Sequence, residues 1–172
     1  FGKKRSEIFS PGNEKIRETF AQDFQILGSA LDKSVEFQKE RGSGVVMYMT
    51  QNTVARIYNS FLLLSGSKDE TILAKAETYA REAVAGSPTN PQGYWVLAQS
   101  LVLGKKISEA DAALEKALSI DPYNTQSHRV SIQLANSLND KRMAAIRLER
   151  AKQYIPEFSL ERPKKVPKNY AR

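Results

Sequence analysis

Few side chains in this sequence could take part in chemical catalysis. The 172 residues include no cysteine and a single histidine, His128. No pair of carboxylates stands at a spacing typical of general acid and base catalysis, and the nucleophile of thiol enzymes is absent. His128 falls where a large packing residue is expected, which favours a structural role. The sequence therefore predicts that the chain itself is not an enzyme, with no catalytic residue, no cofactor and no metal site.

Residues suited to binding are easier to find. On a helix of 3.6 residues per turn, two stretches each place amides on one side, together with an aromatic ring or a guanidinium. Amide groups both donate to and accept from an extended peptide backbone, and a large ring or a guanidinium can anchor it. The candidate partner-binding residues are Gln92, Trp95, Gln99, Arg129, Gln133 and Asn136.

Each of these residues also has a plainer interpretation. Trp95 could pack against Tyr94, Leu101 and the neighbouring unit instead of facing a partner. The amides could form an ordinary solvated surface. Four cations near the end of the repeats favour the polar outside of a terminal unit over a docking patch. These cations are Arg142, Arg147, Arg150 and Lys152.

The two stretches belong to a repeat with a period of 34 residues. Small or apolar residues and a proline recur at this offset in three copies, because closely approaching helices need small facing side chains and proline ends a helix. This pattern predicts stacked helical hairpins. The four sets are Ala76, Ala110 and Ala144; Ala80, Leu114 and Leu148; Ala83, Ala117 and Ala151; and Pro88, Pro122 and Pro156.

The central copy resembles the tetratricopeptide repeat (TPR). The matching residues are Tyr94, Leu97, Ala98, Leu101, Ala110, Leu114, Ala117 and Pro122. The resemblance covers about residues 45–158. It implies an all-α, TPR-like right-handed superhelix of antiparallel hairpins, with about seven helices. It also implies a concave face, lined by the first helix of each hairpin, that binds a protein or peptide segment.

The expected organisation follows the chain in order. A basic segment, 1–12, precedes a long packing helix, 13–42, which Asn13 could cap. A divergent hairpin at 43–90, a clean one at 91–124 and a terminal one at 125–158 follow, and a basic tail, 159–172, ends the chain. We expect the chain beyond Pro156 to be extended or disordered. The long helix carries an apolar stripe expected to cover the first repeat: Ile16, Phe20, Phe24, Leu27, Leu31 and Val35. The next helix should bury Met47, Val54, Ile57, Phe61 and Leu64.

The net charge of +7 is concentrated toward the ends, because residues 159–172 contribute +4 and residues 1–9 contribute +2. A phosphate-binding surface more often forms one stripe on a folded face, so a nucleic-acid partner is disfavoured. The longest apolar runs are too short to span a bilayer, which needs about 20 residues. Because the sequence begins with Phe1, we expect that it is a piece of a longer chain.

A second resemblance concerns the segments GNEKIRETFAQ and AETYAREAVAGSPTNPQGYWVLAQ. They look like the soluble C-terminal extension of bacterial O-antigen ligase or polymerase-like membrane proteins, whose membrane part transfers glycans. This resemblance implies membrane proximity through the termini, and the cluster at 3–5 fits the cytoplasmic side. Three functions thus stay open: a protein-interaction scaffold or adaptor, the extension of a glycan-transferring membrane protein, and a structural or oligomerising module. The compartment and the oligomeric state are not predicted.

Overall fold

The computed structural model describes residues 14–41 and 44–160. In these two ranges the chain forms seven α-helices and no strand, which confirms the all-α, TPR-like hairpin architecture. The helices are α2 (Glu14–Arg41), α3 (Gly44–Ser65), α4 (Glu70–Gly86), α5 (Pro91–Leu103), α6 (Ile107–Ile120), α7 (Thr125–Ser137) and α8 (Lys141–Tyr154). The predicted cap Asn13, the segment 1–12 and residues 161–172 lie outside the described residues, as do the side chains of Ile16 and Phe20.

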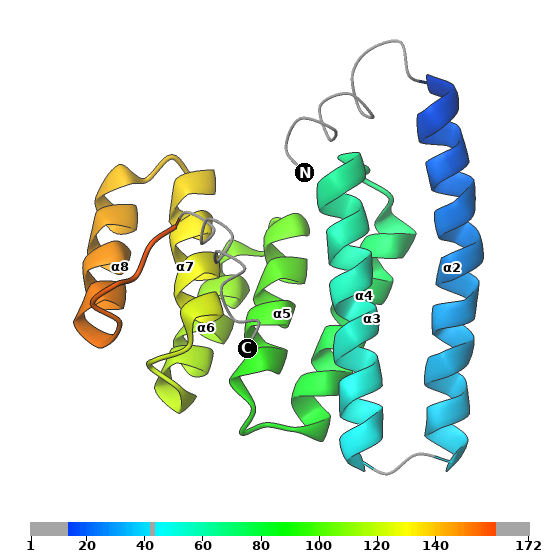
Figure 1. Cartoon of the computed structure of the whole chain (residues 1–172), viewed down its shortest axis with the longest axis horizontal. Helices are drawn as coiled ribbons and strands as arrows, with labels where there is room; N and C mark the ends of the chain where they lie inside the picture. The colour runs from blue at the N-terminus through cyan, green and yellow to red at the C-terminus, as the bar shows by residue number, and fades with distance from the viewer. Residues whose placement is uncertain (1–13, 42–43, 161–172) are drawn as a thin grey trace, which may run out of the picture.

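The helices follow one another across the molecule in chain order (Figure 1). The long helix α2 forms one end and α8 the other, and α4 lies behind α3 in this view. Helix α3 contacts α5, and α5 contacts α7, so the first helices of successive hairpins form one continuous layer. We call α3, α5 and α7 the inner helices, and α4, α6 and α8 the outer helices.

Short polar side chains begin the helices of the repeat. The Asn90 side chain accepts a hydrogen bond from the Gln92 amide at 2.9 Å, and Pro91 occupies the first turn of α5, as predicted. Asn124, which is 34 residues further on, accepts from the Ser127 amide at 2.9 Å in the same way. These caps satisfy amides that would otherwise lack partners at a helix start.

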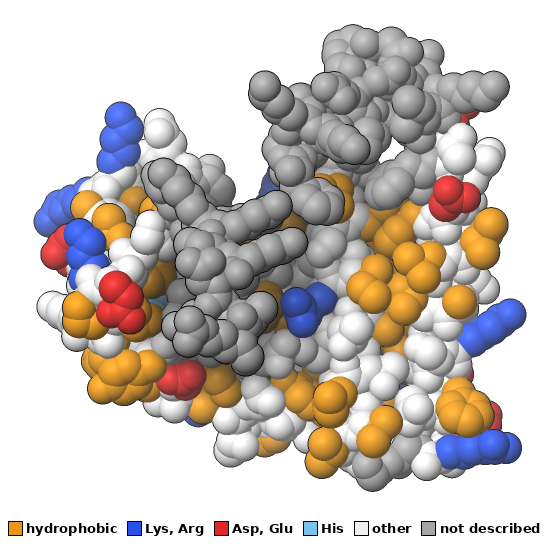
Figure 2. Space-filling view, in the orientation of Figure 1, with side chains coloured by type: hydrophobic (Ala, Val, Ile, Leu, Met, Phe, Trp, Pro, Cys, Tyr) orange, Lys and Arg blue, Asp and Glu red, His pale blue; other side chains and the backbone are white. Residues whose placement is uncertain are grey.

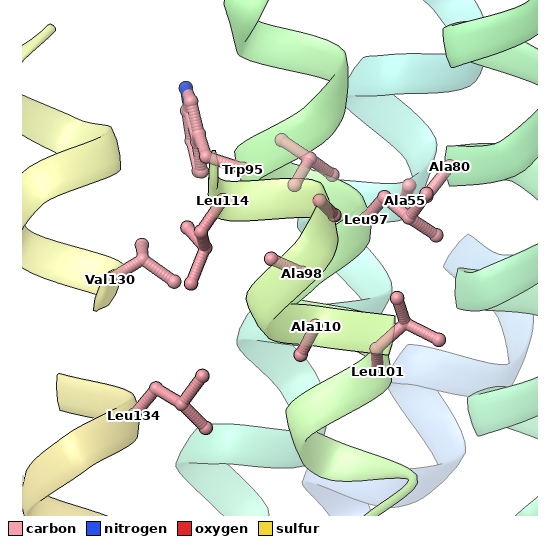
Figure 3. Close-up of a cluster of buried hydrophobic side chains, with 12 residues drawn as sticks. Ala55, Ala80, Trp95, Leu97, Ala98, Leu101, Ala110, Leu114, Val130 and Leu134 are labelled. Atoms are coloured by element: carbon pink, nitrogen blue, oxygen red, sulfur yellow. The ribbon is translucent and has the colours of Figure 1, made fainter. Parts of the chain in front are cut away.

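The repeated alanines lie where helices cross. Ala76, Ala80, Ala83, Ala110, Ala117 and Ala151 are all fully buried. In the core of the central hairpin, Ala98 and Ala110 lie between larger side chains such as Leu101 and Leu114 (Figure 3). Val130 and Leu134 reach into the same core from α7, so the last hairpin is joined to the central one by a shared apolar cluster.

The turns inside the central and last hairpins share one backbone geometry. Lys105 and Asn139 are 34 residues apart, and they are the non-glycine residues of the described chain with positive φ, at 59° and 56°. The following amides bond back to the preceding helix, Lys106 N to Leu101 O at 2.8 Å and Asp140 N to Ala135 O at 3.0 Å. Glycine is the residue that adopts this conformation with least strain.

Lys105→Gly should therefore stabilise the protein. The left-handed conformation costs a lysine about 1 kcal/mol, and part of the gain is offset by the greater freedom of glycine in the unfolded chain. We expect a rise of about 1 to 3 °C in the midpoint of thermal unfolding, measured by calorimetry. Lys116→Gly, in the exposed interior of α6, should lower the midpoint instead. A fall with Lys105→Gly would contradict this account of the turn.

The long helix α2 packs on α3 and α4 through part of its predicted stripe. Phe24 and Val35 are buried, and Leu31 is half-buried. The prediction for Leu27 is wrong, because this side chain is 46% exposed. Its place against α3 is taken by Gly28, whose carbonyl accepts a hydrogen bond from the Tyr58 hydroxyl at 3.1 Å. An added Cβ at Gly28 would lie only 3.3 Å from that hydroxyl, so the missing side chain permits the close approach.

Helix α3 buries more polar groups than its sequence predicts. Val54 and Phe61 are buried as expected and Met47 and Ile57 partly so, whereas Leu64 is 42% exposed and was wrongly predicted to be buried. The Asn59 side chain donates to the Val96 carbonyl at 3.2 Å and accepts from the Ser100 hydroxyl at 3.0 Å. These bonds join two inner helices through satisfied polar groups, which fixes their register.

The outer helices are linked by ion pairs. Arg81 of α4 bonds to Glu109 of α6 at 2.5 Å, and Arg150 of α8 bonds to Glu115 of α6 at 2.7 Å. Arg147 pairs with Asp111 and also donates to the Ser131 carbonyl. Exposed pairs of this kind contribute up to about 1 kcal/mol each. Several charges of the outer surface are thus engaged with one another, as expected for the polar outside of a stacked array.

Candidate binding groove

A groove of about 550 Å³ runs between the inner helices α5 and α7. One residue from the end of α3 and one from the segment after α8 complete its walls. Apolar side chains alternate with amides and one guanidinium along it. The inner groove, as we name it, is lined by Leu63, Gln99, Val102, Leu103, Gln126, Arg129, Val130, Gln133, Leu134, Ser137 and Leu160.

Three of the six predicted binding residues line this groove together. They are Gln99 from α5 and Arg129 and Gln133 from α7. Gln92 is half-buried at the first turn of α5, and Asn136 is exposed near the end of α7; neither lines the inner groove. The equivalent positions of two hairpins thus meet across one hollow, as the 34-residue offset implies.

Trp95 belongs to the core rather than to an open platform. Only 6% of its surface is exposed, and its ring packs in the cluster that contains Leu114 and Val130 (Figure 3). The guanidinium of Arg56, on α3, lies over the ring at 5.6 Å from its centroid. A partner at this level would therefore meet the Arg56 cation rather than the indole. Sequence reasoning missed Arg56, which follows Met49 and precedes Leu63 at intervals of seven residues on one side of α3.

Charge is divided sharply between the two layers. The inner helices α3, α5 and α7 contain no aspartate and no glutamate, and Arg56 and Arg129 are their only arginines or lysines. The outer helices carry carboxylates and cations in the linked pairs described above. The inner face is therefore mildly cationic and rich in amides, without a negative group of its own that would repel an acidic segment.

Several apolar side chains are exposed beside the inner groove. Along α3, Val45 is 70% exposed, Met49 59% and Leu63 49%. Figure 2 shows hydrophobic side chains gathered over the α2 and α3 side of this view. Exposed aliphatic groups of this size next to polar groups are typical of surfaces that bind other proteins.

His128 is a packing residue, as predicted. It is 1% exposed, and its Nε2 lies 2.8 Å from the Pro122 carbonyl, which requires that this nitrogen carries the proton and donates it. The ring also contacts Phe158 edge-on, with 5.9 Å between centroids. Within the described ranges, no group of three histidine, cysteine or acidic side chains could hold a metal ion.

The chain after Pro156 departs from its prediction of an extended or disordered tail. Phe158 is only 7% exposed and packs with Ile132 and Ala151, because it fills the space beside the last hairpin. Beyond it, the Ser159 carbonyl accepts a hydrogen bond from Arg129 at 3.1 Å, and Leu160 lines the inner groove. The described end of the chain therefore turns into the candidate site.

A second hollow, between α2 and the start of α4, contains the carboxylate of Asp32. This side chain accepts hydrogen bonds from Tyr58 at 2.8 Å, Tyr79 at 2.9 Å and Lys75 at 2.5 Å. Desolvation by burial acts to raise the pKa of Asp32, but the three donors and the Lys75 charge outweigh it and hold the pKa below its usual value. Burial and the nearby carboxylate raise the pKa of both tyrosines, so both remain protonated donors. This cluster fastens α2 to the array, so we assign it a structural role.

Comparisons with known proteins give likeness in fold only. Two solved structures align with 85% of this chain: MamA 41-end from Desulfovibrio magneticus RS-1, at 15% identity, 97% coverage of that chain and a TM-score of 0.45, and the MamA RS-1 ArsTM double mutant, at 16% identity, 96% coverage and a TM-score of 0.44. No protein-family description and no curated protein matches the sequence. Among residues 14–41 and 44–160, no helix is long and apolar enough to cross a membrane.

Proposed function

We propose that this chain is a protein-interaction scaffold whose inner groove binds an extended segment of a partner protein. The observation that carries the proposal is the division of charge: the inner helices lack carboxylates, whereas charges of the outer helices pair with one another. A surface selected only for solubility would place charge on both layers.

The residues of the inner groove fit the needs of an extended backbone. Gln99 and Gln133 project from neighbouring helices and can each donate to a carbonyl and accept from an amide. Arg129 supplies a guanidinium that already bonds to a main-chain carbonyl at 3.1 Å. Val102 and Leu63 supply apolar contact area for side chains of the partner.

The test begins with a peptide selected on the full chain from a random peptide display library. Its affinity is then measured by fluorescence polarisation for the wild type and for the double variant Arg129→Ala, Gln133→Ala. Loss of two central polar contacts should weaken binding about tenfold or more, since 1.4 kcal/mol corresponds to a factor of ten. The matched control is Arg150→Ala, Gln153→Ala on the outer helix α8, which should change the affinity less than about twofold. Equal loss in both variants would overturn the proposal.

A structural or oligomerising role is the second candidate, favoured by the outward side of α2. Ile26 is 72% exposed and Phe37 is 52% exposed, and the two lie three helical turns apart on the same side. Sedimentation velocity over a hundredfold concentration range tests this role, because a dimer through this side would dissociate on dilution. The glycan-transferring alternative stays a prediction, which an upstream region of several hydrophobic spans in the full-length protein would support.

A further inference from the structure

The segment that follows α8 is anchored beside the inner groove. The Phe158 ring is buried against Ile132 and Ala151, and its amide bonds to the Ile155 carbonyl at 2.9 Å. Burial of a phenylalanine side chain contributes about 2 to 3 kcal/mol, which is enough to hold a short segment in place. The direction in which the chain continues is therefore fixed by a core contact and not by the groove itself.

The two residues after this anchor occupy part of the inner groove. The Ser159 carbonyl takes a hydrogen bond from Arg129 at 3.1 Å, and the Leu160 side chain forms part of the wall. Arg129 is the residue that the sequence singled out to contact a partner. In this structure it holds the main chain of the protein itself, in the way that a peptide ligand would be held.

We propose that the segment from Ser159 to the C-terminus is an internal occupant of the inner groove, which a partner must displace. This inference rests on the proposed function and concerns the regulation of that same site. Ser159 and Leu160 are already in place, so the remaining residues 161–172 start at the groove. Twelve extended residues reach up to about 40 Å, and the inner helices α7, α5 and α3 span roughly 20 Å at the usual helix spacing.

The composition of residues 161–172 suits an occupant without secondary structure. Pro163 and Pro167 disfavour a helix and favour an extended backbone, which makes no internal hydrogen bonds. Its carbonyls and amides are thus available to side chains such as Gln99 and Gln133. Val166 and Tyr170 offer apolar surface to groove residues such as Val102.

Charge keeps this occupant weakly bound. Residues 161–172 carry a net charge of +4, and the inner helices contribute two arginines and no carboxylate. Repulsion therefore opposes docking, and salt screens it at a distance of about 8 to 10 Å. Occupancy should rise as the salt concentration increases, the reverse of what an ionic attraction would give. A partner segment without this positive charge would displace the tail readily.

A disulfide trap in the full chain tests the location of the tail. Because the natural sequence has no cysteine, pairs can be introduced without background. The first pair is Lys164→Cys with Gln99→Cys in the inner groove, and the control pair is Lys164→Cys with Lys116→Cys on the outer helix α6. Under mild oxidation the groove pair should form its disulfide at least about tenfold faster than the control pair, and faster still in high salt. Equal rates for the two pairs would overturn the inference.

Two further measurements separate its parts. Adding Phe158→Ala to the groove pair should slow disulfide formation to the rate of the control pair, because the anchor is lost. The oxidised groove pair should bind the display-selected peptide at least about tenfold more weakly than its reduced form, with oxidised Gln99→Cys alone as the control. Unchanged binding would show that the tail does not compete. The trap itself uses no partner, so its failure would leave the proposed function standing, whereas failure of the Arg129 and Gln133 variants would overturn that function.

Discussion

Phe24→Ala is expected to lower the midpoint of thermal unfolding by about 10 °C. The Phe24 ring stacks on Phe61 with 3.6 Å between centroids and 12° between planes, and it meets Tyr58 edge-on at 5.7 Å. Removing a buried phenylalanine side chain costs about 3 to 5 kcal/mol, and each kcal/mol shifts the midpoint by about 2 to 4 °C in a chain of this size. The loss should be large because this ring joins α2 to the first hairpin.

Circular dichroism at 222 nm during heating measures the effect. The matched control is Phe37→Ala on the same helix, since Phe37 is 52% exposed and its main contact is the Arg41 guanidinium at 5.1 Å from the ring centroid. That variant should lose no more than about 3 °C. Similar losses in the two variants would mean that α2 is not docked through Phe24, and the role of this helix as a cover for the first repeat would have to be abandoned.

The hairpin array could be predicted from the sequence because its cause is local and repeated. Alanine at a helix crossing and asparagine or proline at a helix start act within one or two turns, so the pattern at Ala110 or Asn90 carries its own explanation. The helices of the central hairpin accordingly begin and end within about one residue of the predicted positions. A period that places equivalent residues on adjacent hairpins also brought Gln99 and Gln133 to one groove.

The features that escaped prediction depend on contacts between distant parts of the chain. Leu27 was predicted to be buried from its spacing, but Gly28 allows α3 to approach so closely that the helix turns Leu27 toward solvent. Nothing near Arg56 in the sequence reveals that its guanidinium covers Trp95, which is 39 residues further on. Phe158 lies in a stretch rich in polar residues and prolines, and only the shape of the last hairpin shows where its ring packs.

The Asp32 cluster gives the second large prediction, because its three donors come from two other helices. Tyr58 belongs to α3, and Lys75 and Tyr79 belong to α4. In Asp32→Asn the charge that faces Lys75 is lost, and a single amide oxygen must serve donors that now share a carboxylate. We expect a loss of about 2 kcal/mol in the free energy of unfolding at pH 7, measured with urea.

The dependence of this loss on pH follows from the lowered pKa of Asp32. Since the pKa is lower in the folded state than the usual value of 3.8, the folded state favours the carboxylate, and the stabilisation is complete above that value. It is lost as the pH falls through the folded pKa, where the wild type becomes protonated and resembles the amide variant. The gap in stability between wild type and Asp32→Asn should thus be constant from pH 7 to about pH 5 and narrow below about pH 4.

Comparison of the two chains isolates Asp32 from other acidic groups. Burial acts to raise the pKa of Glu77, but bonds from Lys106 and Arg81 lower it overall, so this carboxylate adds its own acid sensitivity to both chains equally. Asp23→Asn, at an exposed position of the same helix α2, is the matched control and should leave the stability within about 0.5 kcal/mol of wild type. If the gap for Asp32→Asn stayed the same at pH 3, the carboxylate charge would not be what fastens α2 to the array, and the packing of Phe24 and Val35 would have to account for its docking.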